Sequence, residues 1–307
     1  MDKKKRSLSL RGKEILSGYL FISIWIVGFL GFFVLNFAKV IQFSFNEIVF
    51  DSHAGGYSLV FVGLDNFKNI FLENADFNQQ FTESMLNMLI DVPLILIFSL
   101  IIALMLNRKM KFRGMFRVIF FLPVILAAEA VDSAMEQALM AIMGGVSNIP
   151  DEVREGMESG GVSVMYLIRT FSQFGIPVEI IEYLADAISR IYNIIRDSGV
   201  QIIIFLAALQ SVPSSLYEVA KIEGATAYET FWKITFPMVS PLILTNAIYT
   251  IVAMYAKSEV VQLAYTNAFN LMNFGVGSAM SVVSSLTTCL ILMVIGFLMS
   301  KRIYYRV

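Results

Sequence analysis

The sequence predicts an all-α polytopic membrane protein: about six transmembrane helices, a cytoplasmic helix-turn-helix and amphipathic helices on the outer side. Hydrophobic residues make up 57% of the 307 residues and charged residues only 15%, and the mean hydropathy is +0.71. These values differ from those of a soluble domain. Several apolar stretches reach the roughly 20 residues that cross about 30 Å of hydrocarbon. Lysine and arginine gather in alternate connections between these stretches, as multi-pass proteins require.

Composition also excludes several function classes. The net charge of −1 gives no basis for a nucleic-acid partner, and Cys289 and His53 are the single cysteine and histidine of the chain. We therefore expect neither a disulfide framework nor a metal site. The sequence lacks a G-x-x-x-x-G-K-[ST] phosphate loop, so it is not expected to bind ATP by that route. Because HExxH, GxSxG and paired histidines are also missing, we do not expect an enzyme.

The first predicted span covers residues 15–38 and follows a cytoplasmic tail, residues 1–14. The basic residues 3–6 resemble the start of a signal peptide. The apolar run is longer than a signal-peptide core, however, and no small-residue cleavage site follows it, so an uncleaved span is expected. Residues 39–83 then form an outer segment, in which aromatic residues and the pair Gly55-Gly56 predict a folded cap.

Five further spans are predicted within a core of residues 84–300: 84–106, 115–140, 190–210, 236–257 and 277–300. The third and fourth contain charged residues: Glu129, Asp132, Glu136, Arg190, Arg196 and Asp197. Between them lies an outer insertion, residues 144–187. It begins as a loop rich in Gly, Ser, Pro and acidic residues and continues with apolar residues at helical spacing. This pattern predicts short amphipathic helices that lie on the outer membrane surface or on the other spans. Two extra spans in this insertion are the alternative, which its charges and Pro177 disfavour.

Charge placement tests this count. Six spans starting from a cytoplasmic N-terminus leave residues 1–14, 107–117, 211–235 and 301–307 in the cytoplasm. These segments contain sixteen of the 23 lysine and arginine residues and only five of the 24 acidic residues. Positive residues near span ends are retained on the cytoplasmic side. Both termini and the polar segment 211–237 are therefore predicted to face the cytoplasm.

The polar segment has the features of a helix-turn-helix. Ser214 or Ser215 is expected to cap a first helix, with Glu218 near the positive end of its dipole. Gly224 permits a sharp turn that a bulkier residue resists. Residues 225–234 form the expected second helix, and Pro237 begins the next span. Its aromatic residues offer an apolar surface to a partner, although local physics equally allows an ordinary interfacial helix.

Part of this segment resembles a known family. Glu218, Ala220, Gly224, Ile234 and Pro237 reproduce the spacing of the EAA loop of ABC importer permeases, with Val219 in place of a family alanine and Phe236 in place of a leucine. The flanking residues resemble the sugar-importer branch, which includes maltose and glycerol-phosphate permeases. The stretches concerned are residues 206–217, 236–241, 63–67, 106–107 and 116–123. The chain departs from that branch in two outer segments: 260–277 lacks a Gly-Gly-Pro-type turn, and 144–187 is long.

The resemblance implies a non-catalytic permease subunit in a bacterial cytoplasmic membrane that forms half of a pathway for a sugar or oligosaccharide. Its implied partners are two ATPase subunits, which bind ATP and Mg, a second homologous permease in a heterodimer, and an outer solute-binding protein. The chain itself is expected to bind no cofactor. The residues implied in ATPase coupling are Glu218, Val219, Ala220, Gly224, Ala225, Ile234 and Pro237.

Polar residues inside spans are candidates for the substrate pathway, because a charge that faces lipid costs several kcal/mol. They are Asn87, Asp91, Glu129, Asp132, Asn193, Arg196, Asn246, Tyr249, Tyr255 and Lys257. Alternatively, Asp91, Arg196 and Lys257 lie near the outer interface and snorkel or pair with one another. The alternative function is an ion-coupled secondary transporter with Asp91, Glu129 and Asp132 as proton relays. Such a protein has no need of segment 218–237 and usually shows repeat symmetry.

Overall fold

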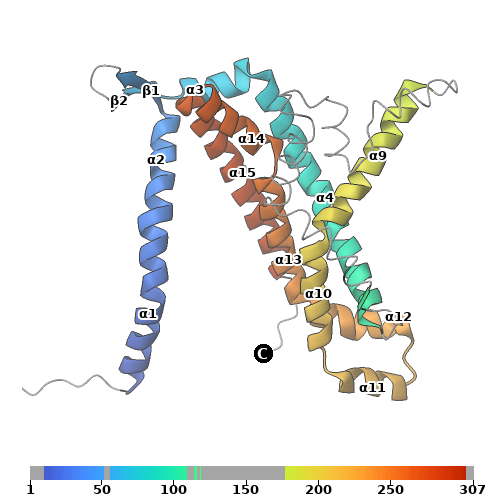
Figure 1. Cartoon of the computed structure of the whole chain (residues 1–307). Helices are drawn as coiled ribbons and strands as arrows, with labels where there is room; N and C mark the ends of the chain where they lie inside the picture. Colours follow the sequence, from blue (N-terminus) through green and yellow to red (C-terminus); the bar gives the residue numbers. More distant parts are fainter. Residues whose placement is uncertain (1–9, 52–55, 109–113, 116–117, 119–176, 302–307) are drawn as a thin grey trace, which may run out of the picture. The chain divides into compact units, whose positions relative to one another are not determined.

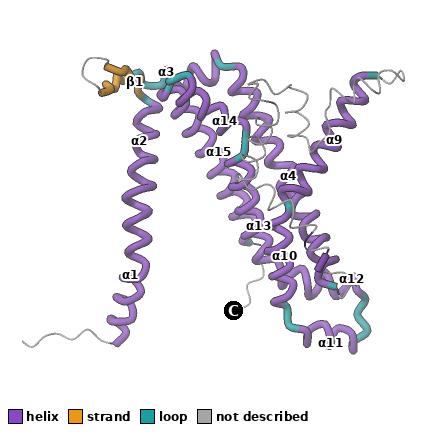
Figure 2. The backbone as a smooth tube through the Cα atoms, in the orientation of Figure 1, coloured by secondary structure: helices purple, strands orange, loops and turns teal. Residues whose placement is uncertain are grey.

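The computed structural model describes residues 10–51, 56–108, 114–115, 118 and 177–301. These residues are predominantly helical (Figures 1 and 2). The chain divides into two compact units. The first comprises residues 1–85 and 256–289, and the second comprises residues 86–255 and 290–307.

The first unit begins with one long helical run, made of α1 (Leu10–Gly28), the π-helical turn η1 (Phe29–Val34) and α2 (Leu35–Ser44). Residues 17–44 of this run are long and apolar enough to cross a membrane. The predicted first span is therefore present, and its helix continues beyond residue 38 because apolar residues resume after Lys39. Four aromatic rings stack along one side of the run at four-residue spacing: Trp25, Phe29, Phe33 and Phe37.

A short antiparallel sheet follows this first span. Strand β1 (Asn46–Asp51) pairs with β2 (Gly56–Phe61), with Asn46 opposite Phe61. The helical turns α3 (Asp65–Lys68) and η2 (Asn69–Glu73) complete the segment. The all-α expectation did not include this hairpin, although its strands are rich in the β-branched and aromatic residues that favour a pleated structure.

One side chain and two glycines hold the rest of the first unit together. The Asn66 side-chain amide donates to the carbonyl oxygens of Ser44 and Asn46, each at 3.1 Å. The unit also contains α14 (Glu259–Tyr265), η5 (Thr266–Asn270) and the first part of α15 (Phe274–Ser300). A Cβ atom on Gly275 would lie 2.6 Å from the Asn46 oxygen, and one on Gly277 would lie 2.7 Å from the Ala268 Cβ. Only glycine permits this packing at either position.

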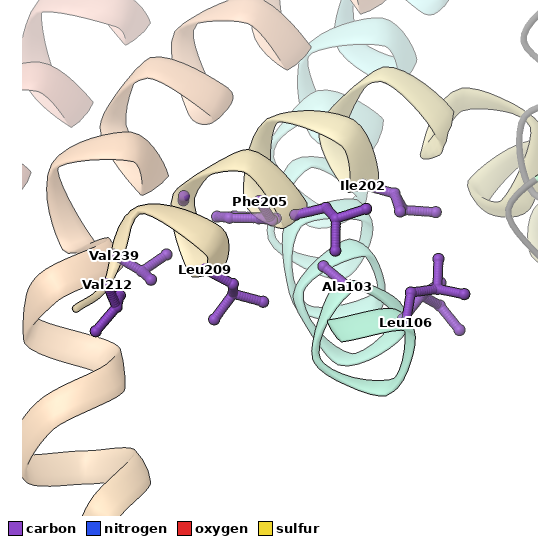
Figure 3. Packing of buried hydrophobic residues seen from close by; sticks show 10 residues of the cluster. Ala103, Leu106, Ile202, Phe205, Leu209, Val212 and Val239 are labelled. Atoms are coloured by element: carbon purple, nitrogen blue, oxygen red, sulfur yellow. The ribbon is translucent and has the colours of Figure 1, made fainter. Parts of the chain in front are cut away.

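The second unit contains most of α4 (Ala75–Asn107) together with α9 (Val178–Asp197), α10 (Gly199–Ser211), α11 (Ser214–Ile222), α12 (Ala227–Thr230), η4 (Phe231–Thr235) and α13 (Phe236–Ala256). Its hydrophobic core joins α4, α10 and α13. Figure 3 shows Ile202 and Phe205 of α10 beside Ala103 of α4, with Val212 next to Val239. Leu216 and Tyr217 of α11 pack against the same cluster.

Among the described residues, four helical runs are long and apolar enough to cross a membrane: residues 17–44, 75–107, 227–256 and 274–300. Residues 183–197 and 199–211 are bent by 49° relative to each other and add a fifth span when this pair is counted as one broken helix. These four or five spans correspond to predicted ones. The predicted span 115–140 lies outside the described residues, apart from residues 115 and 118.

Two helix boundaries differ from the expected ones. Helix α9 begins at Val178, directly after Pro177, and runs without a break to Asp197. The apolar positions expected in a short amphipathic helix and the first residues of the predicted fourth span therefore lie on one helix. The second helix of the polar segment also fails to end before Pro237, since residues 227–256 form one run. The Phe236 amide bonds to the Phe231 oxygen in a π-type turn, which precedes a proline that has no N–H to donate.

Candidate coupling site and substrate pathway

The predicted coupling segment, residues 211–237, contains α11 as its first helix. Helix α11 starts at Ser214, and Pro213 is its N-cap residue with an extended ψ of 131° and no side-chain capping bond. The expected serine cap is therefore wrong, because Pro213 already has the fixed φ and extended ψ from which the helix can start. The Leu216 amide donates to the Pro213 carbonyl oxygen at 3.2 Å.

The sharp turn predicted at Gly224 is present. Gly224 has a φ of +75°, in the left-handed region that glycine adopts at little cost. Its amide donates to the Lys221 oxygen at 3.2 Å, and the Ala225 amide donates to the Ala220 oxygen at 2.9 Å. This pair of bonds is a Schellman motif, which ends α11 and satisfies carbonyl groups of its last turn.

The second arm of the segment begins with a capping box. The Thr226 Oγ1 accepts from the Glu229 amide at 3.2 Å, and the Glu229 carboxylate accepts from the Thr226 amide at 3.0 Å. The carboxylate also lies 3.6 Å from Lys233 Nζ. This cap was not among the predicted features, although Thr226-Ala227-Tyr228-Glu229 has the threonine-to-glutamate spacing that marks one.

The segment leaves apolar side chains uncovered. Ile222 is 86% exposed and Tyr228 is 73% exposed, and large parts of Val219 and Trp232 are exposed as well. Glu218 and Gly224 also lie at the surface, whereas Ala220 is buried, and Ala225, Ile234 and Pro237 are half-buried. We call Val219, Ile222, Tyr228 and Trp232 the exposed apolar surface. In a short polar segment such a surface is typical of a docking site.

A buried polar cluster links α10 to α13. The Asn246 side-chain amide donates to the Gln201 backbone oxygen at 3.1 Å, and the Gln201 side-chain amide donates to Thr250 Oγ1 at 3.0 Å. All three residues are at most 2% exposed. Within the part of the chain that the structure describes, Gln201 Oε1 and Asn246 Oδ1 have no hydrogen-bond partner. Asn246 is a predicted pathway residue, whereas Gln201 and Thr250 were not predicted, although an amide inside the apolar run 199–209 is a usable signal.

An ion pair links α4 to α9. The Arg190 guanidinium donates to Asp91 Oδ1 through Nη2 at 2.6 Å and Nε at 2.8 Å. Asp91 was a predicted pathway residue, whereas Arg190 was not singled out. Arg196 lies 3.5 Å from Asp197 and 5.9 Å from the Tyr192 ring centroid.

The remaining pathway candidates have varied environments. Asn193 is half-buried, with an Oδ1 atom that is buried and lacks a hydrogen-bond partner among the described residues. Asn87 and Tyr249 are exposed, as is Lys257 in the first unit, and Tyr255 is half-buried. Glu129 and Asp132 lie outside the described residues. Where the structure describes the chain, no three His, Cys, Asp or Glu side chains gather closely enough to hold a metal ion.

Comparison with known proteins assigns the family. The family model described as "Binding-protein-dependent transport system inner membrane component" matches residues 198–307, which include the coupling segment and the buried polar cluster. The arabinooligosaccharides transport system permease protein AraP of Bacillus subtilis is 30% identical over 258 residues, covering 79% of this chain and 71% of AraP. The chain belongs to the family of binding-protein-dependent ABC transporter permeases. This confirms the resemblance seen at the EAA loop.

Other relatives extend the match over the whole chain. The probable ABC transporter permease protein YesP of Bacillus subtilis is 28% identical over 330 residues, which cover 99% of this permease and 96% of YesP. The trehalose/maltose transport system permease protein MalF of Thermococcus litoralis is 27% identical over 73% of this permease and 75% of its own length. A chain of a bacterial alginate ABC transporter, solved with an alginate pentasaccharide-bound periplasmic protein, has a TM-score of 0.60 at 18% identity. It covers 94% of this permease and 96% of that chain, and shows a shared fold.

Membership of the family establishes the class of the protein. It is a multi-pass inner-membrane permease subunit of a binding-protein-dependent ABC importer and a non-catalytic component. The ion-coupled transporter and the membrane enzyme considered from the sequence are therefore set aside.

Proposed function

We propose that this permease forms half of a translocation pathway for a sugar or oligosaccharide and is driven by ATPase subunits that dock on residues 218–237. The observation that carries the proposal is the exposed apolar surface of a segment held in shape by the Schellman turn at Gly224 and the capping box at Thr226. An uncovered helix-turn-helix suits a groove in a partner better than a lipid surface does, because the exposed acids Glu218 and Glu223 flank its apolar side chains.

The proposed cargo is a saccharide because several relatives are named for one. AraP is named for arabinooligosaccharides, MalF of Thermococcus litoralis for trehalose and maltose, and the alginate transporter for an acidic polysaccharide. Buried amide oxygens, such as those of Asn193 and Asn246, suit the many hydroxyl groups of a sugar. Asn87, Asp91, Glu129, Asp132, Asn193, Arg196, Asn246, Tyr249, Tyr255 and Lys257 remain the proposed pathway residues.

The complete transporter is proposed to contain a second, homologous permease as heterodimer partner, two ATPase subunits that bind ATP and Mg, and an outer solute-binding protein. The permease itself binds no cofactor in this scheme. Both of its termini face the cytoplasm, which places segment 218–237 on the side where ATP is available. The bias of lysine and arginine toward residues 1–14, 107–117 and 301–307 supports this orientation.

Co-purification tests the proposal. The permease is expressed with its partner permease and the ATPase subunits, and the complex is reconstituted in liposomes. We expect a stable complex with vanadate-sensitive ATPase activity, and uptake that stops without ATP. Uptake that continues without ATP and follows a proton gradient would refute the proposal. Binding of neutral and acidic oligosaccharides to the solute-binding protein then identifies the cargo.

A further inference from the structure

We infer that Tyr217 is a positioning residue: its hydroxyl group fixes α11 to the start of α13, so that α10, α11 and α13 move as one rigid body. This inference rests on the proposed docking of ATPases on segment 218–237. It adds a specific side chain through which a displacement of that segment reaches the membrane-spanning helices.

The attachment of α11 is one-sided. One face is anchored, because Leu216 and Tyr217 pack against the core cluster and Ala220 is 5% exposed. The other residues of the helix, including Val219 and Ile222, are exposed. A force on the exposed face would therefore tilt α11 about its anchored face unless a further contact opposes that motion.

Backbone connections alone resist such a motion poorly. At one end, residues 212–213 are extended, with ψ values of 123° at Val212 and 131° at Pro213. At the other end, four residues that include Gly224 separate α11 from α12. Short non-helical connections of this kind are where hinge motions are absorbed. A side-chain bond between the two arms of the segment is needed to make it rigid.

Tyr217 supplies that bond. Its hydroxyl oxygen lies 3.2 Å from Thr235 Oγ1, and either group can donate the proton. Thr235 is 6% exposed and is the last residue of the π-helical turn that leads into α13. A hydrogen bond with a buried partner is shielded from competing water, so it holds its geometry better than one at the surface.

A second pair of bonds ties the same helices farther along the spans. Gln201 bonds to Thr250 through its side chain and accepts from Asn246 through its backbone oxygen. Helices α10 and α13 are therefore fixed to each other in their middle as well as next to the segment. The rigid body ends at Ser198, where the 49° bend separates α10 from α9.

Spin-label distances in the assembled transporter test the inference. One label is placed at Ser215→Cys on α11 and one at Ile248→Cys on α13, both exposed positions, in a Cys289→Ser background that removes the single native cysteine. Distances are measured without nucleotide and after trapping with ATP and vanadate. With Tyr217 intact, the two distance distributions should coincide. With Tyr217→Phe, they should differ by about 1–2 Å or more, the scale of helix shifts in such transitions.

Matched variants separate positioning from general stability. Thr235→Val removes the partner hydroxyl and should reproduce the Tyr217→Phe result, whereas Thr235→Ser keeps the hydroxyl and should behave like the parent protein. Tyr265→Phe makes the same chemical change at an exposed position of the other unit and should leave the distances unchanged. A merely structural role would lower thermal stability without creating a difference between the two nucleotide states.

The outcomes are distinct. The inference is overturned if the label distance in the parent protein changes with nucleotide. It is also overturned if the distance changes with nucleotide in neither Tyr217→Phe nor Thr235→Val. If either variant instead loses its ATPase subunits, the tyrosine acts in docking and the inference is also overturned. Failure of the proposed function has a different signature, because the parent permease would then not retain ATPase subunits or trap nucleotide at all.

Discussion

Replacement of Gly224 by alanine tests whether the left-handed turn of the coupling segment is required for ATPase docking. A Cβ atom at this position would meet nothing within 4 Å, so the substitution causes no steric clash within the permease. The entire cost comes from the φ of +75°. For a non-glycine residue, the left-handed conformation costs about 1–2 kcal/mol.

This cost predicts the size of the effect. If docking requires the turn, the ATPase dissociation constant should rise roughly 5- to 30-fold, since 1.4 kcal/mol corresponds to a factor of ten. Gly224→Asn should have a smaller effect, because asparagine enters this region more readily. Binding of purified ATPase subunits to the permease pair in nanodiscs measures both constants.

Gly63 provides a matched control. It has a φ of +62° in the turn before α3, in the other unit, and a Cβ there would make only ordinary contacts with the Phe61 ring. Gly63→Ala therefore imposes similar backbone strain and should leave ATPase affinity unchanged. Three results would contradict a requirement for the left-handed turn: normal ATPase binding by Gly224→Ala, an equal loss of binding in Gly224→Asn and Gly224→Ala, or an equal loss in Gly63→Ala.

Three further perturbations have defined outcomes. Glu218→Lys should weaken ATPase retention in pull-down while membrane insertion stays normal, and normal retention would contradict a role in docking. Arg190→Met leaves the mostly buried Asp91 carboxylate without its ion-pair partner, so the unfolding free energy should fall by about 1–3 kcal/mol. Adding Asp91→Asn to this variant should recover part of the loss in thermal melts. A double variant that is no more stable than Arg190→Met would argue against direct coupling of the two residues. Gly275→Ala places a Cβ 2.6 Å from a backbone oxygen and should lower the unfolding free energy by about 1–3 kcal/mol. Gly296→Ala, in the same helix, should be tolerated. Equal melting temperatures of the two variants would contradict the packing argument.

The spans could be predicted because the length of an apolar run is a local property. The turn at Gly224 could also be predicted, since glycine in a polar segment between helices marks a left-handed residue. The hairpin of β1 and β2 was harder to foresee, because strand pairing depends on which residues face each other across a turn. The continuous helix through Pro237 was missed because a proline ordinarily marks a helix start, and the π-type turn before it is not visible in the sequence.

Polar partners in the pathway could not be predicted from one sequence. Asp91 and Arg190 are 99 residues apart, and Gln201 and Thr250 are 49 apart. Spacing within one helix says nothing about which helix lies opposite. The capping box at Thr226 is different. Its signal lies within four consecutive residues, so the sequence alone is sufficient to predict it.

The two tightly packed glycines at the start of α15 restrict how that helix can move. Gly275 and Gly277 are two positions apart, which on an α-helix separates them by roughly 200°. One faces the Asn46 carbonyl group and the other faces Ala268, so neighbours contact nearly opposite sides of the same turn. If α15 rotated about its own axis, a residue larger than glycine would be turned into one of these two contacts. During a transport cycle the first turns of α15 should therefore act as a fixed pivot, and displacement of this helix should increase with distance from Gly277.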